Sequence, residues 1–447
     1  MIFQKVRLLI IFILVVIENI FGQNPIVPAG VYFADPSARV WSDGKLYVYG
    51  SKDESPNYYC SYNYDVLSTN DLMKWTNTSN VFTSKGNGDQ VNYSDGFLYA
   101  PDCQYKNGKY YLYYCMSDKR AAEGVATSTS PTGPFKNGVK MKNAGVEEID
   151  PAVFIDDDGQ AYYIWGQFSA KIAKLKPDMQ SIDSTSIVKN LLTEKEHHFH
   201  EGSFMTKRNG IYYMVYADMS RANRPTCLGY ATSKSPLGPF TYRGVIIDND
   251  NCDPANWNNH GSIVEYKGQW YVFYHRTTNG SVSMRKACVE PIYFNADGTI
   301  DEVEMTTQGA APPLSPFDKI EAERACLLNG SVRVELFESG NEKLTSIKNS
   351  DNVAYKYFDF KEGANAVDMR IKVNKEGTVI VRLDQPWGPI VGISSIKGKE
   401  GDNWQDINFK IKEVKGVHAV WLGFYGNNES TFELDWFIFK KGRAIEK

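Results

Sequence analysis

The sequence has little net charge, one short apolar run and no cysteine motif of the metal-binding kind. Its 447 residues carry a formal net charge of −4 at pH 7, which gives no support for binding to nucleic acid or to an anionic membrane. Beyond the apolar run at residues 8–17, no segment is long and apolar enough to cross a membrane. No Cys-x-x-Cys pair and no histidine-rich spacing indicates zinc. Helical periodicity longer than a turn or two is also missing, which favours an all-β fold.

The first residues have the composition of a secretory signal peptide. A basic start precedes the ten apolar residues 8–17, a run too short to span a bilayer. We therefore expect residues 1–22 to be removed and the protein to be secreted, with a retained membrane anchor as the alternative. Seven cysteines are an odd number, so an oxidising compartment would produce one or two disulfides and leave at least one free thiol.

A short pattern recurs five times in the first 300 residues. A turn pair with glycine second, such as Asp43-Gly44, is followed at once by an aromatic-rich strand, here residues 46–49. This is a strong hairpin signal, because glycine adopts the positive φ of a tight turn. The five glycines stand at positions 44, 108, 159, 210 and 268, and steps of 51 to 64 residues suit one four-stranded blade each. The sequence therefore predicts a five-bladed β-propeller.

One polar residue precedes each hairpin glycine by six to nine positions in a strand-like segment. The five residues are Asp35, Asp102, Asp150, Glu201 and His260. Equivalent positions on successive blades are related by rotation about the propeller axis, so we expect these side chains to meet at one end of the central channel. A lone Asp-Pro is more often a turn or capping acid. Three acids at the same offset of nine residues favour a shared site instead.

The five-fold pattern stops near residue 306, and a different domain follows. Residues 309–318 contain the stretch Ala-Ala-Pro-Pro-Leu-Ser-Pro and have the composition of a stiff linker. From 319 to 441 short strand-like runs continue, with Val379, Val381 and Leu383 alternating on one face. These runs predict a β-sandwich of the jelly-roll type. The expected organisation is a propeller at 23–308, the linker, and the sandwich.

Five motifs of the first domain, in this order and with these gaps, resemble glycoside hydrolase family 43. They are Ala34-Asp35-Pro36-Ser37, Tyr99-Ala100-Pro101-Asp102, Ile-Asp-Pro-Ala-Val-Phe at 149–154, His-Glu-Gly-Ser-Phe at 200–204 and Asn-His-Gly-Ser at 259–262. The family comprises five-bladed propellers that are inverting exo-enzymes acting on plant hemicellulose. The resemblance implies a general base at Asp35, a pKa-setting acid at Asp150 and a general acid at Glu201. It also implies a channel histidine at His260, which in several members helps to hold a calcium ion.

Hydrolysis with inversion requires the same groups on chemical grounds. One carboxylate deprotonates the attacking water, while a second, protonated carboxyl donates a proton to the leaving oxygen. We assign these roles to Asp35 and Glu201, and expect Asp150 to modulate the pKa of the acid and to orient it. The expected substrate contacts are Arg285, Asp102, Tyr99 and Trp165. Arg285 could form paired hydrogen bonds to vicinal hydroxyls, and for the aromatic residues core packing is the alternative.

The second domain resembles carbohydrate-binding module family 6. The resemblance lies in Ile-Glu-Ala-Glu at 320–323, the stretch 363–384 and Leu-Asp-Trp-Phe at 434–437. In that family the first and last of these segments meet on neighbouring strands and hold a structural calcium. This implies Glu321, Glu323 and Asp435 as ligands, whose oxygens suit a hard cation. Sandwich termini with plain surface acids are the alternative.

These features together predict a secreted inverting exo-glycosidase that releases terminal α-L-arabinofuranosyl residues from arabinoxylan or arabinan. A β-xylosidase, or an enzyme with both activities, is the first alternative, because one pocket geometry accepts either pentose. A non-hydrolytic carbohydrate-binding protein is the second. A retaining fructan-cleaving propeller also uses three acids, but its nucleophile lies within about 5.5 Å of the acid.

The predicted chemistry requires no cofactor, and any calcium would be structural. The expected partner is a plant cell-wall polysaccharide or oligosaccharide. We expect no binding to nucleic acid and, once the signal peptide is removed, none to a membrane. The protein is expected to be a monomer.

Overall fold

The computed structural model describes residues 22–121, 123–145, 148–361, 363–399 and 403–441, and almost all of its regular elements are strands. In this part of the chain the helical elements are α1 (Glu194–His197) and the 3-10 turns η1 (Ser184–Ser186), η2 (Ala322–Arg324) and η3 (Glu338–Gly340). None of these helices is long or apolar enough to span a membrane. The predicted all-β fold is confirmed. The predicted signal peptide lies outside the described residues, except for Gly22.

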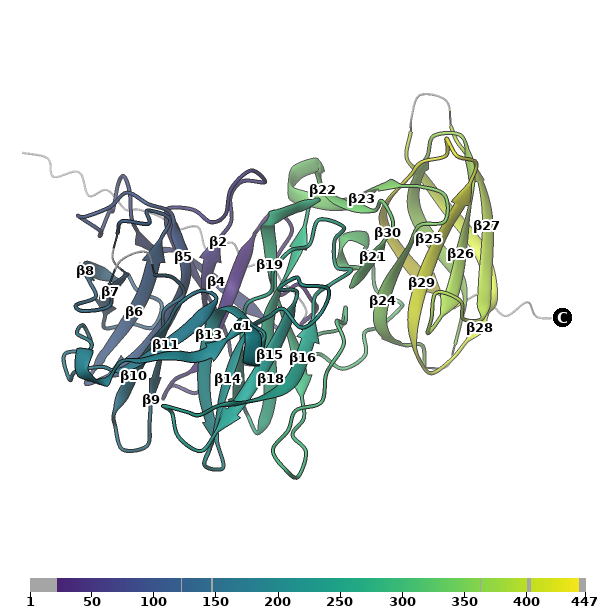
Figure 1. The fold of residues 1–447 in the computed structure, drawn as a ribbon. Helices are drawn as coiled ribbons and strands as arrows, with labels where there is room; N and C mark the ends of the chain where they lie inside the picture. Colours follow the sequence, from purple (N-terminus) through teal and green to yellow (C-terminus); the bar gives the residue numbers. More distant parts are fainter. Residues whose placement is uncertain (1–21, 122, 146–147, 362, 400–402, 442–447) are drawn as a thin grey trace, which may run out of the picture.

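Each of the first four sequence repeats folds as four antiparallel strands in chain order, forming one propeller blade (Figure 1). Blade 1 contains β1 (Phe33–Val40), β2 (Leu46–Lys52), β3 (Asn63–Thr69) and β4 (Trp75–Thr83). Blade 2 contains β5 (Leu98–Lys106), β6 (Lys109–Met116), β7 (Gly124–Ser128) and β8 (Lys136–Lys140). Blade 3 contains β9 (Ala152–Ile155), β10 (Ala161–Trp165), β11 (Ser169–Lys174) and β12 (Val188–Thr193). Blade 4 contains β13 (Phe199–Arg208), β14 (Ile211–Asp218), β15 (Cys227–Ser233) and β16 (Thr241–Asp248).

The fifth blade is completed by the beginning of the described chain. Its strands are β17 (Ser262–Tyr266), β18 (Gln269–Thr278) and β19 (Ser281–Ile292). Residues 24–26 lie along the edge of β19, where the Ile26 N–H donates to the Ala287 carbonyl over 2.9 Å. The Asn24 side chain exchanges hydrogen bonds with the Val289 backbone at 3.0 and 2.9 Å. The N-terminal segment therefore takes the fourth position that the sequence had predicted for a strand of the repeat.

The hairpin turns of the repeat and the contacts between blades confirm the propeller. All five turn glycines have φ between +74° and +83° and join the first two strands of their blades. The first strands β1, β5, β9, β13 and β17 contact one another in this order, and β17 contacts β1. This ring of inner strands places residues from distant parts of the sequence around one channel.

The second domain consists of two sheets packed over one hydrophobic core. One sheet has the order β21 (Leu327–Asn329), β24 (Asn352–Asp359), β29 (Val417–Gly426), β26 (Glu376–Leu383), β27 (Ile390–Lys397). The other has the order β28 (Gln405–Val414), β25 (Ala364–Val373), β30 (Phe432–Lys440), β23 (Asn341–Ile347), β22 (Arg333–Phe337), with β20 (Ile320–Glu321) also paired to β30. A single residue pair between β27 and β28 joins them. Alternate residues Val379, Val381 and Leu383 of β26 face the core, as predicted.

The sandwich is packed tightly against the propeller instead of hanging from a spacer. Lys286 of β19 forms a buried ion pair with Glu342 of β23, and both side chains are at most 5% exposed. Residues of the sandwich, including Trp421, share a hydrophobic cluster with blades 4 and 5. The predicted linker also runs along the sandwich, where the Leu314 N–H donates to the Tyr357 carbonyl over 2.8 Å. The exact domain boundaries stay predictions.

Candidate active site

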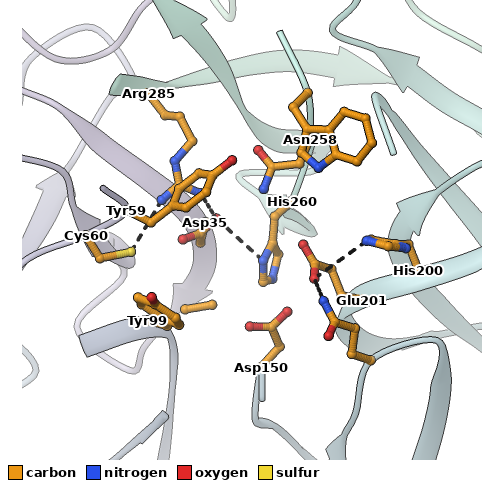
Figure 2. A pocket seen from close by; sticks show the side chains of 13 residues that line it. Asp35, Tyr59, Cys60, Tyr99, Asp150, His200, Glu201, Asn258, His260 and Arg285 are labelled. Carbon is orange, nitrogen blue, oxygen red and sulfur yellow. Dashed lines mark hydrogen bonds and ion pairs between the residues drawn. The ribbon is translucent and has the colours of Figure 1, made fainter. Parts of the chain in front are cut away.

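A pocket with a cavity volume of about 240 Å³ lies where the first strands of the five blades begin. Every blade contributes to its lining, which consists of Asp35, Tyr59, Cys60, Tyr99, Ala100, Asp150, Gln167, His200, Glu201, Trp257, Asn258, His260 and Arg285. Figure 2 shows the carboxyl groups of Asp35, Asp150 and Glu201 around one space, with His260 between them. The structure therefore brings together the three acids that the sequence repeat pointed to.

Irregular backbone at the start of the inner strands turns these acids toward the pocket. Asp35 and Asp150 have φ values of +54° and +56°, a left-handed conformation that is uncommon for residues other than glycine. The pairing of β1 with β2 shifts register between Ala34 and Ser37, and β13 shifts against β14 on both sides of Glu201. Bulges and strained residues of this kind redirect side chains and concentrate at functional sites.

Gly202 allows the acid-bearing strand of blade 4 to pass close to His260. Its φ is +73°, and a Cβ atom at this position would lie only 2.9 Å from the His260 ring. The Gly202 N–H also donates a hydrogen bond to the Asp150 carboxyl group. A side chain here would therefore displace Glu201, Asp150 or the imidazole.

Asp35 is held as a carboxylate by the groups around it. Arg285 Nη1 donates to its Oδ1 over 2.8 Å and Ser51 Oγ donates to its Oδ2 over 2.6 Å. The Nδ1 atoms of His260 and His275 lie 3.6 and 3.5 Å from Oδ1. Burial by itself would favour the protonated form, but the charge of Arg285, with smaller contributions from the two histidines and Ser51, outweighs it and lowers the pKa of Asp35 to about 2.

His275 fixes the strained backbone of Asp35. The Asp35 N–H donates to His275 Nδ1 over 3.2 Å, which leaves the imidazole proton on Nε2, facing the backbone and side-chain oxygens of Asn258 at 3.2 Å each. Burial and the nearby Arg285 lower the pKa of His275 to about 3. The ring is therefore a neutral, fixed acceptor for the Asp35 N–H.

Arg285 lines the pocket, but its donors are committed to protein carboxylates. Its Nε and Nη2 atoms form paired 2.9 Å hydrogen bonds with Asp53, and Nη1 binds Asp35. The guanidinium also lies over the Tyr59 ring, with 5.0 Å to its centroid. Contact of Arg285 with sugar hydroxyls therefore stays a prediction; in the structure the partner of its paired donors is Asp53, and its Nη1 atom positions Asp35.

Asp150 and Glu201 form an interacting pair of carboxyl groups on the opposite side of His260 (Figure 2). The Asp150 N–H points at Cys115 Sγ over 3.3 Å, and Glu201 Oε2 accepts a 2.8 Å hydrogen bond from Gln167. His200 Nε2 lies 3.9 Å from the same Glu201 oxygen. Burial and then the charge of Glu201 raise the pKa of Asp150 well above its usual value. The surroundings therefore favour the protonated form of Asp150.

The sequence-based prediction gave Asp150 the role of a partner that modulates the pKa of Glu201 and orients it, and that role stays a prediction. Asp150 is buried, with 7% of the residue exposed, and burial disfavours its charged form.

Asp102 ties blades together and does not line the pocket. Arg39 Nη2 binds both of its carboxylate oxygens, at 2.8 and 2.6 Å. Ser37 Oγ donates over 2.6 Å, and the Val153 N–H of blade 3 donates over 2.7 Å. Asp102 is 1% exposed. The predicted substrate contact is therefore corrected to a structural junction of blades 1, 2 and 3.

The two aromatic residues predicted to contact substrate have different positions. Tyr99 lines the pocket as predicted. Trp165 is 2% exposed and belongs to the core between blades 2 and 3, where its ring lies 5.5 Å from that of Tyr163. Trp165 is thus a packing residue, because strand alternation turns it away from the channel.

The described residues contain no group of three or more His, Cys, Asp or Glu side chains arranged to hold a metal ion. Burial lowers the pKa of His260, so its imidazole is neutral and already faces the Asp35 carboxylate. Glu321 and Asp435 lie on the paired strands β20 and β30, and Glu323 follows in η2. The predicted calcium ligands of the sandwich are therefore neighbours, although they do not form a ready-made cluster.

All seven cysteines lie in the described part of the chain, and all are buried free thiols. The expected one or two disulfides are absent there. Several sulfur atoms instead have polar partners of their own; Cys60 Sγ lies 3.4 Å from Arg285 Nη2 and Cys252 Sγ 3.4 Å from Thr277 Oγ1. Buried cysteines of this kind behave as small apolar side chains.

Five of the remaining lining residues were not identified from the sequence because they come from loops outside the repeated pattern. Tyr59 and Cys60 lie between β2 and β3, and Gln167 lies between β10 and β11. Trp257 and Asn258 precede β17 in a segment with asparagine at 256, 258 and 259. That polar cluster just before His260 was a usable signal, since loops at the rim of a rigid scaffold often carry function.

Comparison with known proteins agrees with this geometry. The model of "Glycosyl hydrolases family 43" matches residues 22–300, and that of "Carbohydrate binding module (family 6)" matches residues 321–441. A protein of Thermoclostridium stercorarium named xylosidase/arabinosidase is 29% identical over 92% of this chain and 97% of its own length. The arabinoxylan arabinofuranohydrolase of Bacillus subtilis is 30% identical over 94% of this chain and 93% of its own length.

A solved structure extends the similarity to both domains. The family 43 arabinoxylan arabinofuranohydrolase of Bacillus subtilis, in complex with cellotetraose, covers 95% of this chain and 99% of its own, with a TM-score of 0.55 and 27% identity. The predicted resemblance to both families is confirmed. Since the family 43 model matches more than half of the chain and relatives align across both domains, the protein belongs to glycosyl hydrolases family 43 and is a glycoside hydrolase that carries a family 6 carbohydrate-binding module.

Proposed function

We propose that the protein is an inverting exo-α-L-arabinofuranosidase that removes terminal arabinofuranosyl residues from arabinoxylan-type hemicellulose. Membership of the family supports arabinofuranosidase or xylosidase activity on carbohydrate. The observation that carries the proposal is the convergence of Asp35, Asp150 and Glu201 in one pocket. The preference for arabinose rests on the name of the relative from Bacillus subtilis, arabinoxylan arabinofuranohydrolase.

The size of the pocket supports action on a chain end. Its cavity of about 240 Å³ is smaller than the roughly 300–1,000 Å³ of sites that hold drug-sized ligands. Five blades surround it, so a single terminal sugar fits inside while the rest of the polysaccharide stays outside. Next to the acids and Arg285, the lining contains aromatic and amide side chains, which suit an uncharged sugar.

Asp35 is the proposed general base. Because the charge of Arg285 keeps its pKa at about 2, it is a carboxylate throughout the working range of a hydrolase. Its Oδ1 and Oδ2 are held by Arg285 and Ser51, and the lone pairs that remain can accept a proton from a water molecule. That water then attacks the anomeric carbon from the face opposite the leaving group.

Glu201 is the proposed general acid. Its side chain is 16% exposed at the pocket, so the glycosidic oxygen can approach it. In this role Glu201 donates a proton to the leaving oxygen. The Gly202 N–H donates a hydrogen bond to the neighbouring Asp150 carboxyl group, which fixes Asp150 beside Glu201.

The test compares hydrolysis of 4-nitrophenyl α-L-arabinofuranoside and 4-nitrophenyl β-D-xyloside, with the first product anomer followed by NMR. We expect faster cleavage of the arabinofuranoside and a product of inverted configuration. A clear preference for the xyloside would support the second candidate, a β-xylosidase or dual enzyme, which the name xylosidase/arabinosidase of one relative favours. A retained configuration would contradict the assignment of Asp35 as base.

The proposal includes secretion, action on plant cell-wall polysaccharide and a monomeric state. The composition of residues 1–22 supports export, and the carbohydrate-binding module supports a polymeric substrate. N-terminal sequencing of protein from the culture medium, combined with light scattering, tests these points. A mature protein that begins at residue 1, or a stable dimer, would contradict them.

Structural calcium in the sandwich is a further part of the proposal. Glu321 Oε2 and Glu323 Oε2 are buried without a hydrogen-bond partner among the described residues. Burial raises the pKa of Glu323 to about 7, and burial together with the charge of Glu321 raises the pKa of Asp435. These carboxyl oxygens fit a hard cation, which would neutralise their repulsion. At His260 the fit is poor, because Arg285 already supplies the positive charge beside Asp35.

Removal of calcium should therefore lower the thermal stability of the sandwich. We expect chelation with EDTA to reduce the midpoint of thermal unfolding and added calcium to restore it, since a ligand that binds only the folded state stabilises it. Glu323→Gln should abolish the response to calcium without changing hydrolysis. An identical midpoint with EDTA and with calcium would contradict the site.

A further inference from the structure

We propose that blade 4 carries a second binding site, a basic groove that takes a carboxylate-bearing sugar of an acidic polysaccharide. The basic groove has a cavity volume of about 430 Å³ and lies between the turn that joins β15 to β16 and the turn at residues 295–299. Its cationic side chains are Lys234 and Arg243. The inference goes beyond the proposed function and rests on it only in the choice of a polysaccharide as the ligand.

The basic groove lies at the end of blade 4 that faces away from the catalytic pocket. Its lining includes Ile211, the first residue of β14, and Thr232 and Ser233 at the end of β15. Strand β14 begins directly after the hairpin turn of the blade, whereas the catalytic pocket lies where the inner strands begin. A ligand in the groove is therefore separate from the substrate in the pocket.

The two cationic side chains of the groove have donors to spare. Arg243 Nε donates to Thr232 Oγ1 over 2.8 Å, while its two Nη atoms have no hydrogen-bond partner among the described residues. Lys234 forms neither a hydrogen bond nor an ion pair in that part of the chain. By contrast, Arg221 and Arg224 of the same blade are paired with carboxylates. Two positive charges that line one cavity are thus available to an anion.

These charges are not required to build the blade. The Ala-Thr-Ser stretch that begins at position 231, with the Pro and Gly-Pro-Phe that follow it, repeats the stretch that begins at position 126 in blade 2. Both stretches form the same strand, turn and strand in equivalent register. At the equivalent positions blade 2 has Thr129 in place of Lys234 and Gly138 in place of Arg243. The charges are therefore additions to a turn that also forms without them.

The opposite wall of the groove is held firmly against blade 4. Tyr213 Oη donates to the Gly298 carbonyl over 2.7 Å, and the Ile300 N–H donates to Tyr230 Oη over 2.7 Å. Gly298 has a φ of +87°, and a Cβ atom there would lie 2.9 Å from Tyr213 Oη. The turn at residues 295–299 therefore approaches the blade closely, and the groove is formed before any ligand binds. Binding to a preformed site avoids the cost of ordering it.

The hydroxyl groups of the groove add further donors. Thr232 Oγ1, Ser233 Oγ and Ser235 Oγ each accept one hydrogen bond from the protein, and their own protons have no acceptor among the described residues. Asp297 is the acidic exception in the lining, and its Oδ1 is occupied by the N–H and hydroxyl of Thr299 at 2.9 and 2.7 Å. Such an excess of donors favours a ligand rich in acceptor oxygens. A carboxylate matches the guanidinium geometry best.

The size and lining of the groove favour an acidic sugar over a bare ion or a neutral sugar. At about 430 Å³ it is larger than the catalytic pocket of about 240 Å³, so a small inorganic anion would leave most of the space empty. None of the described residues that line it is aromatic, so there is no ring on which a neutral sugar could stack. A uronate residue supplies both the carboxylate for Arg243 and the hydroxyls for the Ser and Thr side chains. The ligand class is a hemicellulose chain that carries uronate groups.

The test is affinity electrophoresis of the full-length protein in gels that contain glucuronoxylan or the same polymer after its carboxyl groups have been reduced to alcohols. Binding at any site for neutral sugar appears in both gels, whereas the basic groove contributes only with the acidic polymer. Arg243→Ala and Lys234→Ala should each raise the dissociation constant for glucuronoxylan by about tenfold or more, as expected for loss of a charge-assisted hydrogen bond. Neither should change binding to the reduced polymer.

Two further variants separate the groove from general effects of charge and folding. Lys136→Ala is the matched control, since Lys136 is an exposed lysine at the start of β8, after the equivalent turn of blade 2; it should bind glucuronoxylan like the wild type. Asp297→Asn should bind more tightly, because it removes a carboxylate that repels the ligand. A folding defect would not produce such a gain. Weaker binding by Asp297→Asn, or an equal loss with Lys136→Ala, would overturn the proposal.

The wild-type protein and the source of the anion provide the remaining outcomes. Equal retention of the wild type in the two gels, or unchanged retention of both Arg243→Ala and Lys234→Ala, would show that the groove binds no uronate. Calorimetry with D-glucuronate and with inorganic phosphate distinguishes an acidic sugar from a free ion. We expect heat from glucuronate that is lost in Arg243→Ala; binding of phosphate alone would overturn the proposal. None of these measurements requires hydrolysis, so a wild-type protein that cleaved no pentoside would refute the proposed function and leave the groove to be decided by the gels.

Discussion

Asp35 and Glu201 line one cavity, yet the groups around them are of opposite kinds. Asp35 receives a guanidinium, a hydroxyl and a backbone environment fixed by His275. Glu201 receives one amide donor from Gln167 and the repulsion of Asp150. At the scale of single residues, this difference supports the proposed roles of Asp35 as base and Glu201 as acid.

The assignment predicts different responses of the two variants to the leaving group. Asp35→Asn should lower kcat by at least about 100-fold on every substrate, because activation of water is always needed. Glu201→Gln should cause a comparable loss on oligosaccharides but a much smaller one on 2,4-dinitrophenyl glycosides, whose leaving group departs without a proton. Steady-state kinetics of both variants on both substrates checks this, with circular dichroism to confirm the fold. An equal loss for Glu201→Gln on the two substrates would contradict its role as acid.

Glu123 should make the stability of the protein fall as pH rises. It is buried, Tyr163 donates to its Oε2 over 2.8 Å, and burial raises its pKa to about 8. The folded state then holds a proton that the unfolded state releases above its usual pKa of 4.5, so stability decreases between these two values. Glu123→Gln should flatten this decline. Thermal unfolding midpoints at pH 5 and pH 9 provide the measurement, and parallel declines in variant and wild type would refute the prediction.

The sequence predicted the acids of the site but not the residues that set their charge. Asp35, Asp150 and Glu201 could be found because the propeller repeats one position in every blade. Asp53 and His275 have no such counterpart, since each meets Asp35 or Arg285 only through long-range contacts. For the same reason the pairing of Arg285 with Asp53 could not be predicted, because it spans 232 positions.

At the scale of elements, the bulged starts of the inner strands connect fold to chemistry. The hairpin turns at the opposite ends were predictable, because Asn-Gly and Asp-Gly pairs have a local conformational preference. The register shifts near Asp35 and Glu201 could not be predicted from the sequence. A bulge leaves the apolar pattern of a strand almost unchanged, and it forms here where neighbouring inner strands contact one another. The sequence also did not show what would take the place of the fourth strand in blade 5. Residues 24–26 fill it by pairing with β19, which lies more than 250 positions later in the chain.

Gly202→Ala should impair both stability and catalysis, whereas Gly210→Ala should affect stability alone. The two glycines have nearly equal φ, +73° and +74°, so each substitution has a backbone cost of about 1 kcal/mol. A Cβ at position 202 would also approach the His260 ring to 2.9 Å, while nothing lies within 4 Å of one at position 210. Chemical denaturation and kcat, measured for both variants, separate the two effects. Full activity of Gly202→Ala would mean that this close approach does not position Glu201.

At the scale of the whole molecule, the two domains share a charged contact beside the active site. Arg285 and Lys286 are consecutive in β19, and while Arg285 binds Asp35, Lys286 binds Glu342 of the sandwich. Tyr32 also donates to Glu342, over 3.3 Å. Strand β19, whose Arg285 binds the proposed base Asp35, is therefore also anchored to the second domain through Lys286.

Glu342→Gln should reduce the free energy of unfolding by about 3–5 kcal/mol, because it leaves the buried Lys286 ammonium without its counter-charge. The double variant Lys286→Met, Glu342→Leu should recover most of this loss, since an apolar pair of similar size removes both charges. Equilibrium denaturation of the three proteins gives the energies. A loss below about 1 kcal/mol for Glu342→Gln, as for an exposed ion pair, would show that the contact does not hold the domains together.

The two-domain organisation was readable from the end of the repeat and from the Pro-rich stretch after it. The close contact between the two domains could not be predicted, because one lysine and one glutamate form no pattern in a sequence. The aligned relative of solved structure also spans both domains. Within the predicted linker, Leu314 forms an isolated bridge with Phe358 of the sandwich.

The way the ring closes also bears on biosynthesis. Asn24 is among the first described residues to leave the ribosome, but its backbone partner Val289 follows 265 positions later. The nascent first domain must therefore wait as an open arc, with its earliest segment unpaired, until translation of its last blade is nearly finished. Because ring closure uses residues 24–26, an affinity tag is better placed at the other terminus.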